Sequence, residues 1–358
     1  MRVLLLSNMF PSAADPLFGI FVKNFKSELE KQGVAFPHPV LIHGKVRSSL
    51  KKAVRYLRHY CISIFRFVTL QYDLVYVHYL SHHIPILLLM AWLKGKSVVV
   101  NVHGSDIIEL QKHKVLNNLA GFVLKRIGLL VVPTSYFRDL VMEKYPFLKP
   151  ENIFISPSGG IDGSKFYPKK PAESKQVLTL GFISRFIEEK GWKVFMQALV
   201  LLKKQGIPFK ALIAGKGPDE GAIIEYIRAN GLQSDVAMLG LIKQEELLEV
   251  YNKLNLYIFP TYREAESLGL TGLEAMSCGT PVVASNISGP ATYIESGVNG
   301  FLFEPRNSKA LSDIIVHYLG MDPESQKKIS EQAIATGQRY EKGLVAKKLI
   351  NRLESLCI

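Results

Sequence analysis

Two glutamates, Glu266 and Glu274, lie eight residues apart in the stretch YREAESLGLTGLEAMSCGTPVVAS (262–285). The apolar spacing from Gly269 to Ser277 predicts a helix, which places Glu266 in the preceding turn and Glu274 on the helix. Along one continuous helix, eight residues correspond to about 12 Å, which exceeds the roughly 5 to 9.5 Å between the two carboxylates of a glycosidase. The pattern therefore disfavours a paired carboxylate site for glycoside hydrolysis.

The start of the predicted helix favours an anion instead. The free N–H groups around Ser267 to Leu270 and the helix dipole attract negative charge, and the flanking carboxylates can accept hydrogen bonds from hydroxyl groups. A phosphate held between two polyols fits this layout. The alternatives are that Glu274 only complements the helix dipole and that Glu266 is a solvated loop carboxylate.

Two cations strengthen the case for a phosphate. Arg185 and Lys190 follow the predicted strand VLTLGF (177–182), in a short loop that leads into a helix. A guanidinium and an ammonium can clasp a diphosphate together. With the two glutamates they predict a nucleotide-sugar site, in which one carboxylate binds sugar hydroxyls and the other binds the ribose. The alternative is that both cations are surface charges paired with Glu188 and Glu189.

Short runs of Val, Ile and Leu alternate with longer amphipathic segments along the chain. Such runs are typical of buried parallel strands joined by crossover helices, and a chain of 358 residues suits two domains of roughly 170 residues each. We expect an α/β protein with two doubly wound, Rossmann-like domains, a linker near 164–176 and a ligand in the cleft between the domains. The expected parts are residues 1–168, residues 169–337 and a last helix at 338–358 that packs back on the first domain.

The predicted strands are RVLLLSN (2–8), DLVYVHY (73–79), SVVVNVHG (97–104), GLLVVPTS (128–135), NIFISPS (152–158), QVLTLGFIS (176–184), FKALIAG (209–215), VAMLG (236–240), LNLYIFP (254–260) and TPVVAS (280–285).

The net charge of +13 comes entirely from the first half of the chain: residues 1–170 hold 23 Lys and Arg against 10 Asp and Glu, whereas residues 171–358 hold 21 of each. The densest part is GKVRSSLKKAVRYLRHYCISIFRF (44–67). Its cations alternate at helical spacing with apolar residues, a basic amphipathic pattern. The cations are Lys51, Lys52, Arg55 and Arg58, and the apolar residues are Leu50, Val54, Leu57, Cys61 and Ile64.

Three interpretations of this basic segment stay open. It is a solvated helix face over a stripe that faces the core, a surface that docks on anionic lipid, or a site for an anionic acceptor or nucleic acid. No helix-turn-helix, zinc or RNP-type signature accompanies the charge, so we expect no nucleic-acid partner.

The three cysteines, Cys61, Cys278 and Cys357, form no C-x-x-C and no metal spacing, which suits a reducing cytosol. Neither the N-terminal apolar run nor Ile84 to Leu93 is long enough for a signal peptide or a membrane span. His78, His82 and His83 likewise lack a ligand spacing, so we expect no metal site. The expected location is the cytoplasm, with peripheral contact at the inner face of a membrane.

On these motifs the chain resembles, along nearly its whole length, a retaining glycosyltransferase of the GT-B fold, family 4 type (glycosyl transferases group 1). Glu266 and Glu274 match the family's pattern of two glutamates separated by seven residues. Arg185 and Lys190 match its Arg-x4-Lys loop, and AGKGPD (214–219) matches its G-x-G-P turn. A Gly-containing first loop (Gly19), an HG-x-D element (His103, Gly104, Asp106) and the strand PVVAS agree with the same pattern.

The resemblance implies two domains that face a central cleft. It also implies transfer of a hexose-type sugar from a UDP- or GDP-sugar to a glycan or lipid-linked acceptor, in polysaccharide or glycoconjugate biosynthesis, without a cofactor or a divalent metal. The leaving phosphate would help to deprotonate the acceptor, and the protein would orient the reactants and stabilise charge.

The resemblance also implies residue roles. Glu266 would contact the transferred sugar near its anomeric centre, Glu274 would bind the ribose, and His103 would lie near the reacting sugar or its acceptor. Gly19 would let the first loop approach the diphosphate, and the backbone near Leu241 and Ile242 would contact the base. The residues assigned to catalysis are Glu266, His103, Arg185 and Lys190; those assigned to donor binding are Gly19, Arg185, Lys190, Gly215, Leu241, Ile242, Glu266, Ser267, Leu268, Gly269, Leu270 and Glu274.

The chain departs from the family pattern at two places. Where many relatives read E-G-F-G, it reads Glu266-Ser267-Leu268-Gly269, which bears on contacts to the sugar. Where they read P-N-G-V-D, it reads PSGGID (157–162), with Gly159 in the position of the Asn.

Other interpretations compete with these roles. His103 is alternatively a satisfied core histidine, Gly19 a turn residue, and Asp106 the cap of a helix that begins at Ile107. A nucleotide-sugar epimerase and a catalytically inactive binding scaffold are the rival functions. A dinucleotide dehydrogenase is disfavoured because LLLSNMFPSAADPLFG (4–19) lacks G-x-G-x-x-G.

Overall fold

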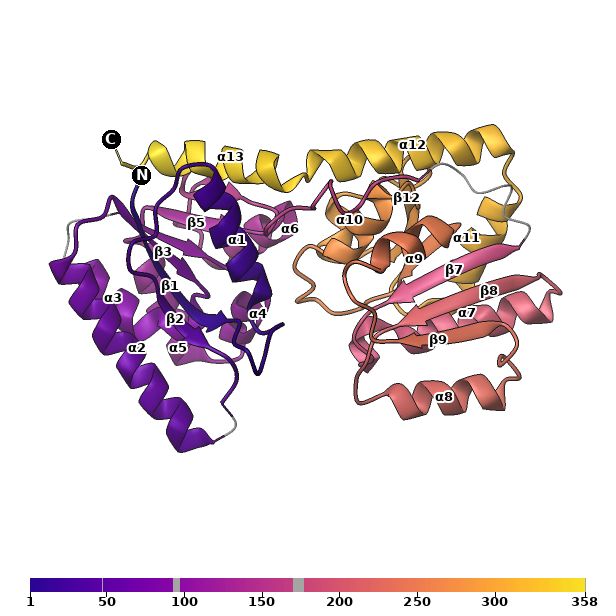
Figure 1. Ribbon diagram of the computed structural model, residues 1–358, viewed down its shortest axis with the longest axis horizontal. Helices are drawn as coiled ribbons and strands as arrows, with labels where there is room; N and C mark the ends of the chain where they lie inside the picture. Colours follow the sequence, from indigo (N-terminus) through magenta and orange to yellow (C-terminus); the bar gives the residue numbers. More distant parts are fainter. Residues whose placement is uncertain (47, 93–96, 170–176, 358) are drawn as a thin grey trace. The chain divides into compact units, whose positions relative to one another are not determined.

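The computed structural model describes residues 1–46, 48–92, 97–169 and 177–357 (Figure 1). It divides into two compact units: unit 1 comprises Met1–Gly160 and Lys342–Ile358, and unit 2 comprises Ile161–Glu341. The first boundary thus lies before the linker predicted at 164–176, of which 170–176 fall outside the described residues. The reason is that Phe166, at 3% exposure, packs into the core of unit 2.

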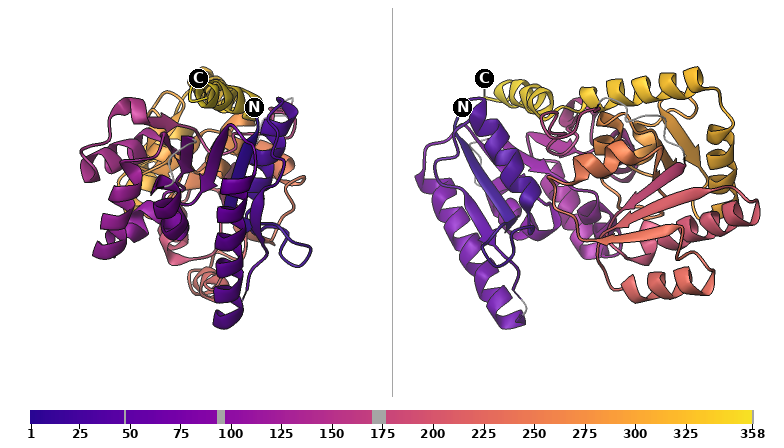
Figure 2. Two further views of the ribbon diagram at one scale, coloured as in Figure 1. Left: turned by 90° about the vertical axis from the view of Figure 1, so that its left-hand side faces the viewer. Right: turned by 45° about the vertical axis from the view of Figure 1, so that its right-hand side comes forward.

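Unit 1 is a parallel sheet with helices on both faces (Figure 2). Its elements are β1 (Val3–Phe10), α1 (Ile20–Lys31), β2 (Val40–His43), α2 (Ser49–Thr69), β3 (Leu74–His78), η1 (Ser81–His83), α3 (Ile84–Trp92), β4 (Ser97–Asn101), α4 (Ser105–Gln111), α5 (Lys114–Leu124), β5 (Leu129–Val132), α6 (Ser135–Lys144), η2 (Pro150–Asn152), β6 (Ile153–Ile155) and α13 (Lys342–Glu354).

The strand order in unit 1 is β2-β1-β3-β4-β5-β6. Alternate strand residues supply two separate cores, because successive side chains point to opposite faces of a sheet. Leu4 and Leu6 of β1 join the core under α3, α4, α5 and α6, whereas Val3 and Leu5 join the core under α1 and α13. Each face therefore needs its own layer of helices.

The last helix, α13, belongs to unit 1 and lies beside α1 (Figure 1). Its buried side chains Ala346, Leu349, Ile350 and Leu353 follow a helical spacing and pack against the strands. The Gln32 amide nitrogen donates a hydrogen bond to the Gly343 carbonyl at 3.0 Å. The helix begins at Lys342, and the preceding α12, which ends at Arg339, belongs to unit 2.

Unit 2 repeats the parallel design with strand order β12-β11-β10-β7-β8-β9. Its elements are β7 (Leu178–Ile183), η3 (Glu188–Lys190), α7 (Trp192–Lys204), β8 (Phe209–Ala214), α8 (Glu220–Ala229), β9 (Val236–Gly240), α9 (Leu247–Lys253), β10 (Leu256–Phe259), α10 (Leu270–Ser277), β11 (Val282–Ser285), η4 (Pro290–Thr292), β12 (Gly300–Phe303), α11 (Ser308–Leu319) and α12 (Pro323–Arg339).

The predicted α/β class with two doubly wound units is confirmed, and all ten predicted strands are present. The sequence analysis missed β2 and β12, each four residues long. The placement of Glu266 in a turn and Glu274 on a helix is also confirmed. Within the described residues, no helix has both the length and the apolar character of a membrane span.

Candidate functional site

The candidate site in unit 2 lies where the direction of winding changes. β7 and β10 are neighbours in the sheet, and the chain leaves them toward opposite edges. The loops that follow two such strands diverge and leave room for a ligand at their carboxyl ends. Arg185 and Lys190 lie in the loop after β7, and Glu266 lies in the loop after β10, so the topology places all three at this point.

Backbone hydrogen bonds join these loops into one platform. The Tyr262 amide donates to the Glu189 carbonyl at 3.0 Å, the Ser184 amide to the Ala214 carbonyl at 3.0 Å, and the Gly289 amide to the Glu266 carbonyl at 3.2 Å. The loops after β7, β8, β10 and β11 are thus tied to one another. Their side chains are held by several elements at once.

Gly191 is required by a close approach of two loops. Its φ of +77° lies in the left-handed region, and a Cβ atom there would lie 1.9 Å from the Pro260 carbonyl oxygen. Because only glycine has no Cβ, only glycine lets the end of β10 reach the residue after Lys190. This contact fixes the lysine beside the Glu266 loop.

Lys190 and Glu266 form an ion pair, with 2.5 Å between Nζ and Oε2. Both side chains are nearly buried, at 11% and 12% exposure, and the Thr261 hydroxyl donates to the same carboxylate oxygen at 3.3 Å. The alternative that Lys190 pairs with Glu188 or Glu189 is therefore wrong. Glu189 instead lies 3.7 Å from Arg263.

Arg185 differs from Lys190, because its side chain is exposed and has no hydrogen bond or ion pair among the described residues. Its own carbonyl accepts a bond from the Ile187 amide at 3.0 Å, which tightens the loop. A guanidinium held on an ordered loop without a carboxylate partner can bind an anion from solution.

The start of α10 offers unbonded donors. Gly269 has φ 81° and precedes the helix, and across the described residues the amides of Ser267, Leu268, Gly269 and Leu270 donate no hydrogen bond. The Ser267 hydroxyl is buried and also lacks a partner. Buried polar groups are normally satisfied, so an unpartnered hydroxyl beside free amides is a second indication of a ligand. Leu268 has a different role, because its side chain packs in the core.

Glu274 lies in the second turn of α10, so it does not act as a first-turn charge that complements the dipole. The Tyr251 hydroxyl donates a hydrogen bond to its Oε2 at 2.9 Å. Burial raises the pKa of Glu274 to about 7, although the bond from Tyr251 opposes this shift. The carboxyl group therefore changes charge near neutral pH, as expected of a site group rather than a structural one.

Gly215, predicted to bind the donor, and Leu241 and Ile242, predicted to contact the base, lie in the neighbouring loops. The Gly215 amide donates to the Gly240 carbonyl at 2.8 Å, and a Cβ on Gly215 would lie 1.8 Å from the Ser184 carbonyl oxygen. Leu241 is exposed, and Ile242 is half-buried against the core. The structure thus places Gly215, Leu241 and Ile242 next to the Arg185 loop.

Two predicted residues, Gly19 and His103, belong to unit 1. Gly19 has φ 70°, and a Cβ there would lie 2.6 Å from the Met9 carbonyl carbon, so the first loop packs tightly against the end of β1. The ring of Phe21 lies 4.8 Å from that of His103, which connects the first loop with the β4 edge.

His103 is half-buried and neutral at physiological pH, because burial lowers its pKa to about 3. Its Nε2 lies 3.0 Å from His78 Nδ1. Asp106 accepts bonds from the amides of His103 at 2.9 Å and Leu80 at 3.0 Å, and it does not cap a helix that begins at Ile107, since α4 begins at Ser105. Asp106 instead joins the turns after β3 and β4.

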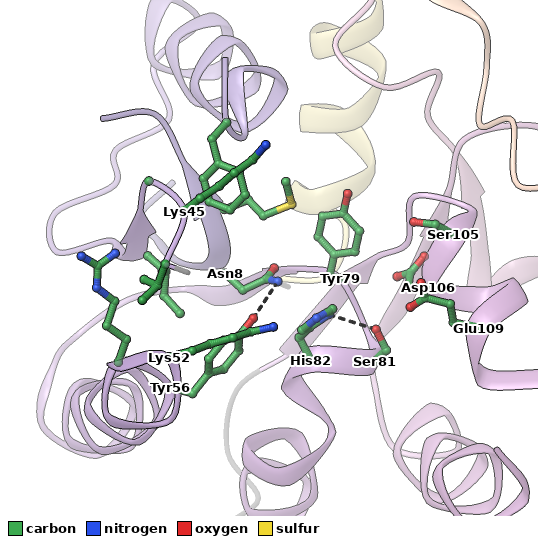
Figure 3. A pocket seen from close by; sticks show the side chains of 16 residues that line it. Asn8, Lys45, Lys52, Tyr56, Tyr79, Ser81, His82, Ser105, Asp106 and Glu109 are labelled. Atoms are coloured by element: carbon green, nitrogen blue, oxygen red, sulfur yellow. Dashed lines mark hydrogen bonds between the residues drawn. The ribbon is translucent and has the colours of Figure 1, made fainter. Parts of the chain in front are cut away.

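Unit 1 also contains a cavity of about 470 Å³ at the carboxyl ends of β1 and β3, where its own strand order reverses. Lys45 and Lys52 lie on one side of it, and Glu109 and Asp106 lie on the other (Figure 3). The Asn8 side-chain amide donates a hydrogen bond to the Tyr56 hydroxyl at 3.2 Å. The cavity therefore combines opposite charges with hydrogen-bonding groups, as a polar ligand requires.

The sequence analysis missed several of these residues. Thr261, in the same loop as Glu266, contacts that glutamate, and Tyr251, on α9, contacts Glu274. The sequence could have indicated Gly191, because a glycine directly after a predicted site lysine suggests a tight turn or a close backbone contact there. Lys52 and Tyr56 lay inside the basic segment, but their place at a cavity depends on the strand order. Across the described residues, no group of three or more His, Cys, Asp or Glu side chains is arranged to hold a metal ion.

Comparisons with known proteins agree with this architecture. Residues 164–336 match the model of the family described as glycosyl transferases group 1. The chain is 26% identical over 272 residues to N-acetyl-alpha-D-glucosaminyl L-malate synthase of Bacillus anthracis, covering 73% of this chain and 68% of the relative. It is 29% identical over 231 residues to the amylovoran biosynthesis glycosyltransferase AmsK of Erwinia amylovora, covering 63% of this chain and 55% of the relative.

Solved structures show the same fold over the whole chain. Sucrose-phosphate synthase from Thermosynechococcus elongatus has a TM-score of 0.77 at 17% identity and 99% coverage of both chains. HepE from Anabaena, solved in complex with UDP-glucose, has a TM-score of 0.70 at 19% identity, with 99% of this chain and 100% of that chain covered. The chain therefore has the GT-B fold, and it is homologous to glycosyltransferases, of which AmsK is matched over little more than half its length.

Proposed function

We propose that the protein is a metal-independent, retaining glycosyltransferase of the family 4 type. It moves a hexose-type sugar from a nucleotide-diphosphate sugar to a glycan or lipid-linked acceptor in polysaccharide or glycoconjugate biosynthesis. The observation that carries the proposal is the Lys190–Glu266 ion pair beside the unbonded amides at the start of α10, with Arg185 free on the adjoining loop. The similarity to AmsK, an amylovoran biosynthesis glycosyltransferase, and to HepE, solved with UDP-glucose, supports the same class.

The unit 2 groups suit a leaving nucleoside diphosphate. Lys190, Arg185 and the amides of the α10 start supply the positive charge that a divalent metal supplies in other enzymes, and they are ordered before the ligand arrives. Donors fixed in advance stabilise charge that develops on the leaving phosphate. A diphosphate that binds Lys190 weakens its bond to Glu266, and the carboxylate is then released to contact the sugar hydroxyls.

Glu274 and the loops around Gly215 suit the nucleoside. An ionised Glu274 accepts hydrogen bonds from two ribose hydroxyls, and the exposed Leu241 offers an apolar contact for a base. In unit 1, the polar cavity and the neutral His103 suit a hydroxyl-bearing acceptor. The leaving phosphate takes the proton of the attacking hydroxyl, so no separate side-chain base is required.

The proposed location is the cytoplasm, at the inner face of a membrane. Among the described residues no cysteine forms a disulfide, as expected in a reducing compartment. The basic charge of the first half of the chain supports contact with an anionic surface.

Thermal unfolding with nucleoside diphosphates tests the donor site. UDP or GDP should raise the melting temperature, because a ligand that binds only the native state stabilises it. Arg185→Ala and Lys190→Ala should abolish this rise and lower the transfer rate by about 10²–10³-fold. Lys204→Ala is the matched control, since Lys204 is an exposed cation at the far end of α7.

Two results would contradict the proposal. Either no nucleoside diphosphate or nucleotide sugar shifts the melting temperature, or both variants keep the wild-type shift and turnover. Conversion of the donor sugar in the absence of any acceptor would instead identify an epimerase.

A further inference from the structure

Helix α2 carries an apolar stripe that unit 1 does not cover. Its members follow one another at intervals of four, three, four, four and three residues, which places them within about 80° of the helix circumference over about 27 Å. Five of them are between 58% and 76% exposed. The stripe comprises Leu50, Val54, Leu57, Cys61, Phe65 and Val68. The interpretation that Leu50, Val54 and Leu57 face the core is therefore wrong.

The exposure does not result from a loose helix. On the opposite face, the Tyr60 hydroxyl donates to the His82 carbonyl at 2.6 Å, and the buried His59 lies 3.0 Å from His83, Nε2 to Nε2. Tyr60, Ile62, Ile64 and Phe67 pack against the core under the sheet. The helix is thus fixed to unit 1 by one face while it presents the stripe on the other.

Cations line one side of the stripe. α2 contains five Lys and Arg residues and no acidic residue. Arg55 and Arg66 are held by the carbonyls of His43 and Pro39 at 2.8 and 3.1 Å. Lys51 and Arg58 are exposed and have no ion-pair partner among the described residues. On the helix Lys51 lies three residues before Val54 and Arg58 lies four residues after it, so both cations lie beside Val54.

We propose that this face of α2 docks on an anionic lipid surface. The stripe would lie among the upper acyl chains, as the apolar face of an interfacial helix does, and the cations beside it would bind lipid phosphates. Charge complementarity selects this occupant over a second copy of the chain. A contact of α2 with its own copy would bring ten cations together without one carboxylate from either helix.

The same helix contributes Lys52, Arg55 and Tyr56 to the cavity of unit 1. A lipid in the layer under α2 therefore lies one helix diameter from the cavity, about 10 Å. On the proposed function, this position brings the headgroup of a lipid-linked acceptor to the polar cavity while its tail stays in the membrane. The docking itself does not depend on the transfer reaction.

Vesicle co-sedimentation tests the docking. The full chain should bind vesicles of phosphatidylcholine with phosphatidylglycerol and should bind pure phosphatidylcholine at least tenfold more weakly. The variant Leu57→Ser/Phe65→Ser and the variant Lys51→Gln/Arg58→Gln should each lose binding at least tenfold. Raising the salt should weaken wild-type binding, because salt screens charge at the surface.

Matched controls separate the stripe from general surface effects. Leu319→Ser changes another exposed leucine on unit 2, and Lys204→Gln removes another exposed cation; both should bind as wild type. A dye on Cys61 in a Cys357→Ser chain should shift to shorter wavelength with anionic vesicles only, since Cys278 is buried.

Equal binding by wild type and both double variants would overturn the proposal, as would a wild type that binds neither kind of vesicle. A dimer in sedimentation velocity that Leu57→Ser/Phe65→Ser dissolves would assign the stripe to a second copy instead. The shift in melting temperature with UDP or GDP, measured without vesicles, should be unchanged in the α2 variants. If UDP or GDP does not shift the melting temperature of the wild type, the result counts against the donor site. If the shift is present but the wild type does not bind vesicles, the result counts against the docking alone.

Discussion

At the scale of residues, the donor site depends on charges that satisfy one another before a ligand binds. Lys190 and Glu266 form an ion pair in which both side chains are nearly buried. Arg185, in contrast, has no carboxylate partner among the described residues. A diphosphate can therefore bind Arg185 directly, but it binds Lys190 only by replacing Glu266 as the partner of the ammonium group. Breaking a nearly buried ion pair costs free energy unless a new anion replaces the old one, so the exchange favours ligands that carry phosphate.

If Glu274 binds the ribose as proposed, nucleotide binding should depend on pH. Its pKa of about 7 means that it is largely ionised at pH 8 and largely protonated at pH 5.5. If the ionised form accepts the ribose hydroxyls, affinity for the nucleoside diphosphate is nearly full at pH 8 and falls as the pH decreases through 7, by up to about tenfold per pH unit. Titration calorimetry at pH 8 and pH 6 measures this difference.

Glu274→Gln is the control for this prediction. The amide cannot ionise, so its affinity should be lower at pH 8 and nearly constant between the two values. A wild-type affinity that does not change with pH would show that Glu274 does not bind the nucleotide as an anion.

The sequence predicted the donor residues better than their partners. Glu266 and Lys190 were predicted to share one nucleotide-sugar site because a cation suits the diphosphate and a carboxylate suits sugar hydroxyls, and the structure joins them directly. Thr261 and Tyr251 were not predicted, because a hydroxyl becomes a site residue only through the fold. The sequence analysis also did not predict that the Ser267 hydroxyl is buried without a hydrogen-bond partner, because the sequence of a loop does not show which of its side chains are buried.

At the scale of elements, the sequence predicted all the inner strands and also two edge strands, β6 and β9. The runs that became β1 and β3 are apolar because helices cover both faces of a parallel sheet. β2 and β12 are edge strands of four residues, and their short runs lie among Pro, His and Gly. Each of the two has only three consecutive apolar residues, Val40–Ile42 and Phe301–Phe303, which is a weak strand signal.

α13 should stabilise unit 1 in a measurable way. Leu353 is fully buried, so Leu353→Ala should cost about 2–4 kcal/mol. Hydrogen exchange of α1 and β1 amides should become faster by about 30-fold or more, while β7 and β8 should be unaffected. Lys348→Ala, on the exposed face of the same helix, is the control and should change neither unit. Equal loss of protection in both units would contradict the assignment of α13 to unit 1.

At the scale of the whole molecule, the two units differ in charge. Unit 1 holds 24 Lys and Arg against 10 Asp and Glu, and unit 2 holds 20 against 21. The basic excess therefore belongs to the unit that bears α2 and not to the unit that bears the donor site. If unit 2 binds phosphate as proposed, the attraction comes from Arg185, Lys190 and the free amides at the start of α10 rather than from the net charge of the unit.

The units should also respond differently to acid. Burial lowers the pKa of His59 to about 4 and those of His83 and His103 to about 3, all in unit 1. Unfolding lets these histidines bind protons below pH 6.5, so their contribution to stability is present above that value and lost as the pH falls. The raised pKa of Asp106, about 6, opposes this loss, but three histidines outweigh one carboxyl group.

Scanning calorimetry at pH 7.5 and 5.5 tests this difference. The unit 1 transition should move to lower temperature at pH 5.5, and the unit 2 transition should move less, because protonation of Glu274 stabilises the folded form. UDP or GDP identifies the unit 2 transition by raising it. Transitions that move together by the same amount would contradict the prediction.

Unit 1 combines an early and a late segment of the chain, Met1–Gly160 and Lys342–Ile358, and this affects how it folds during translation. When Gly160 has left the tunnel, the strands of the first sheet and α1 exist but α13 does not, so the face that bears Val3 and Leu5 is only partly covered. The cover from α13 arrives only after the whole of unit 2 has been translated. During the translation of residues 161–341 the first sheet therefore exposes part of this apolar face. We expect chaperones that bind apolar surfaces to bind the nascent chain at this stage.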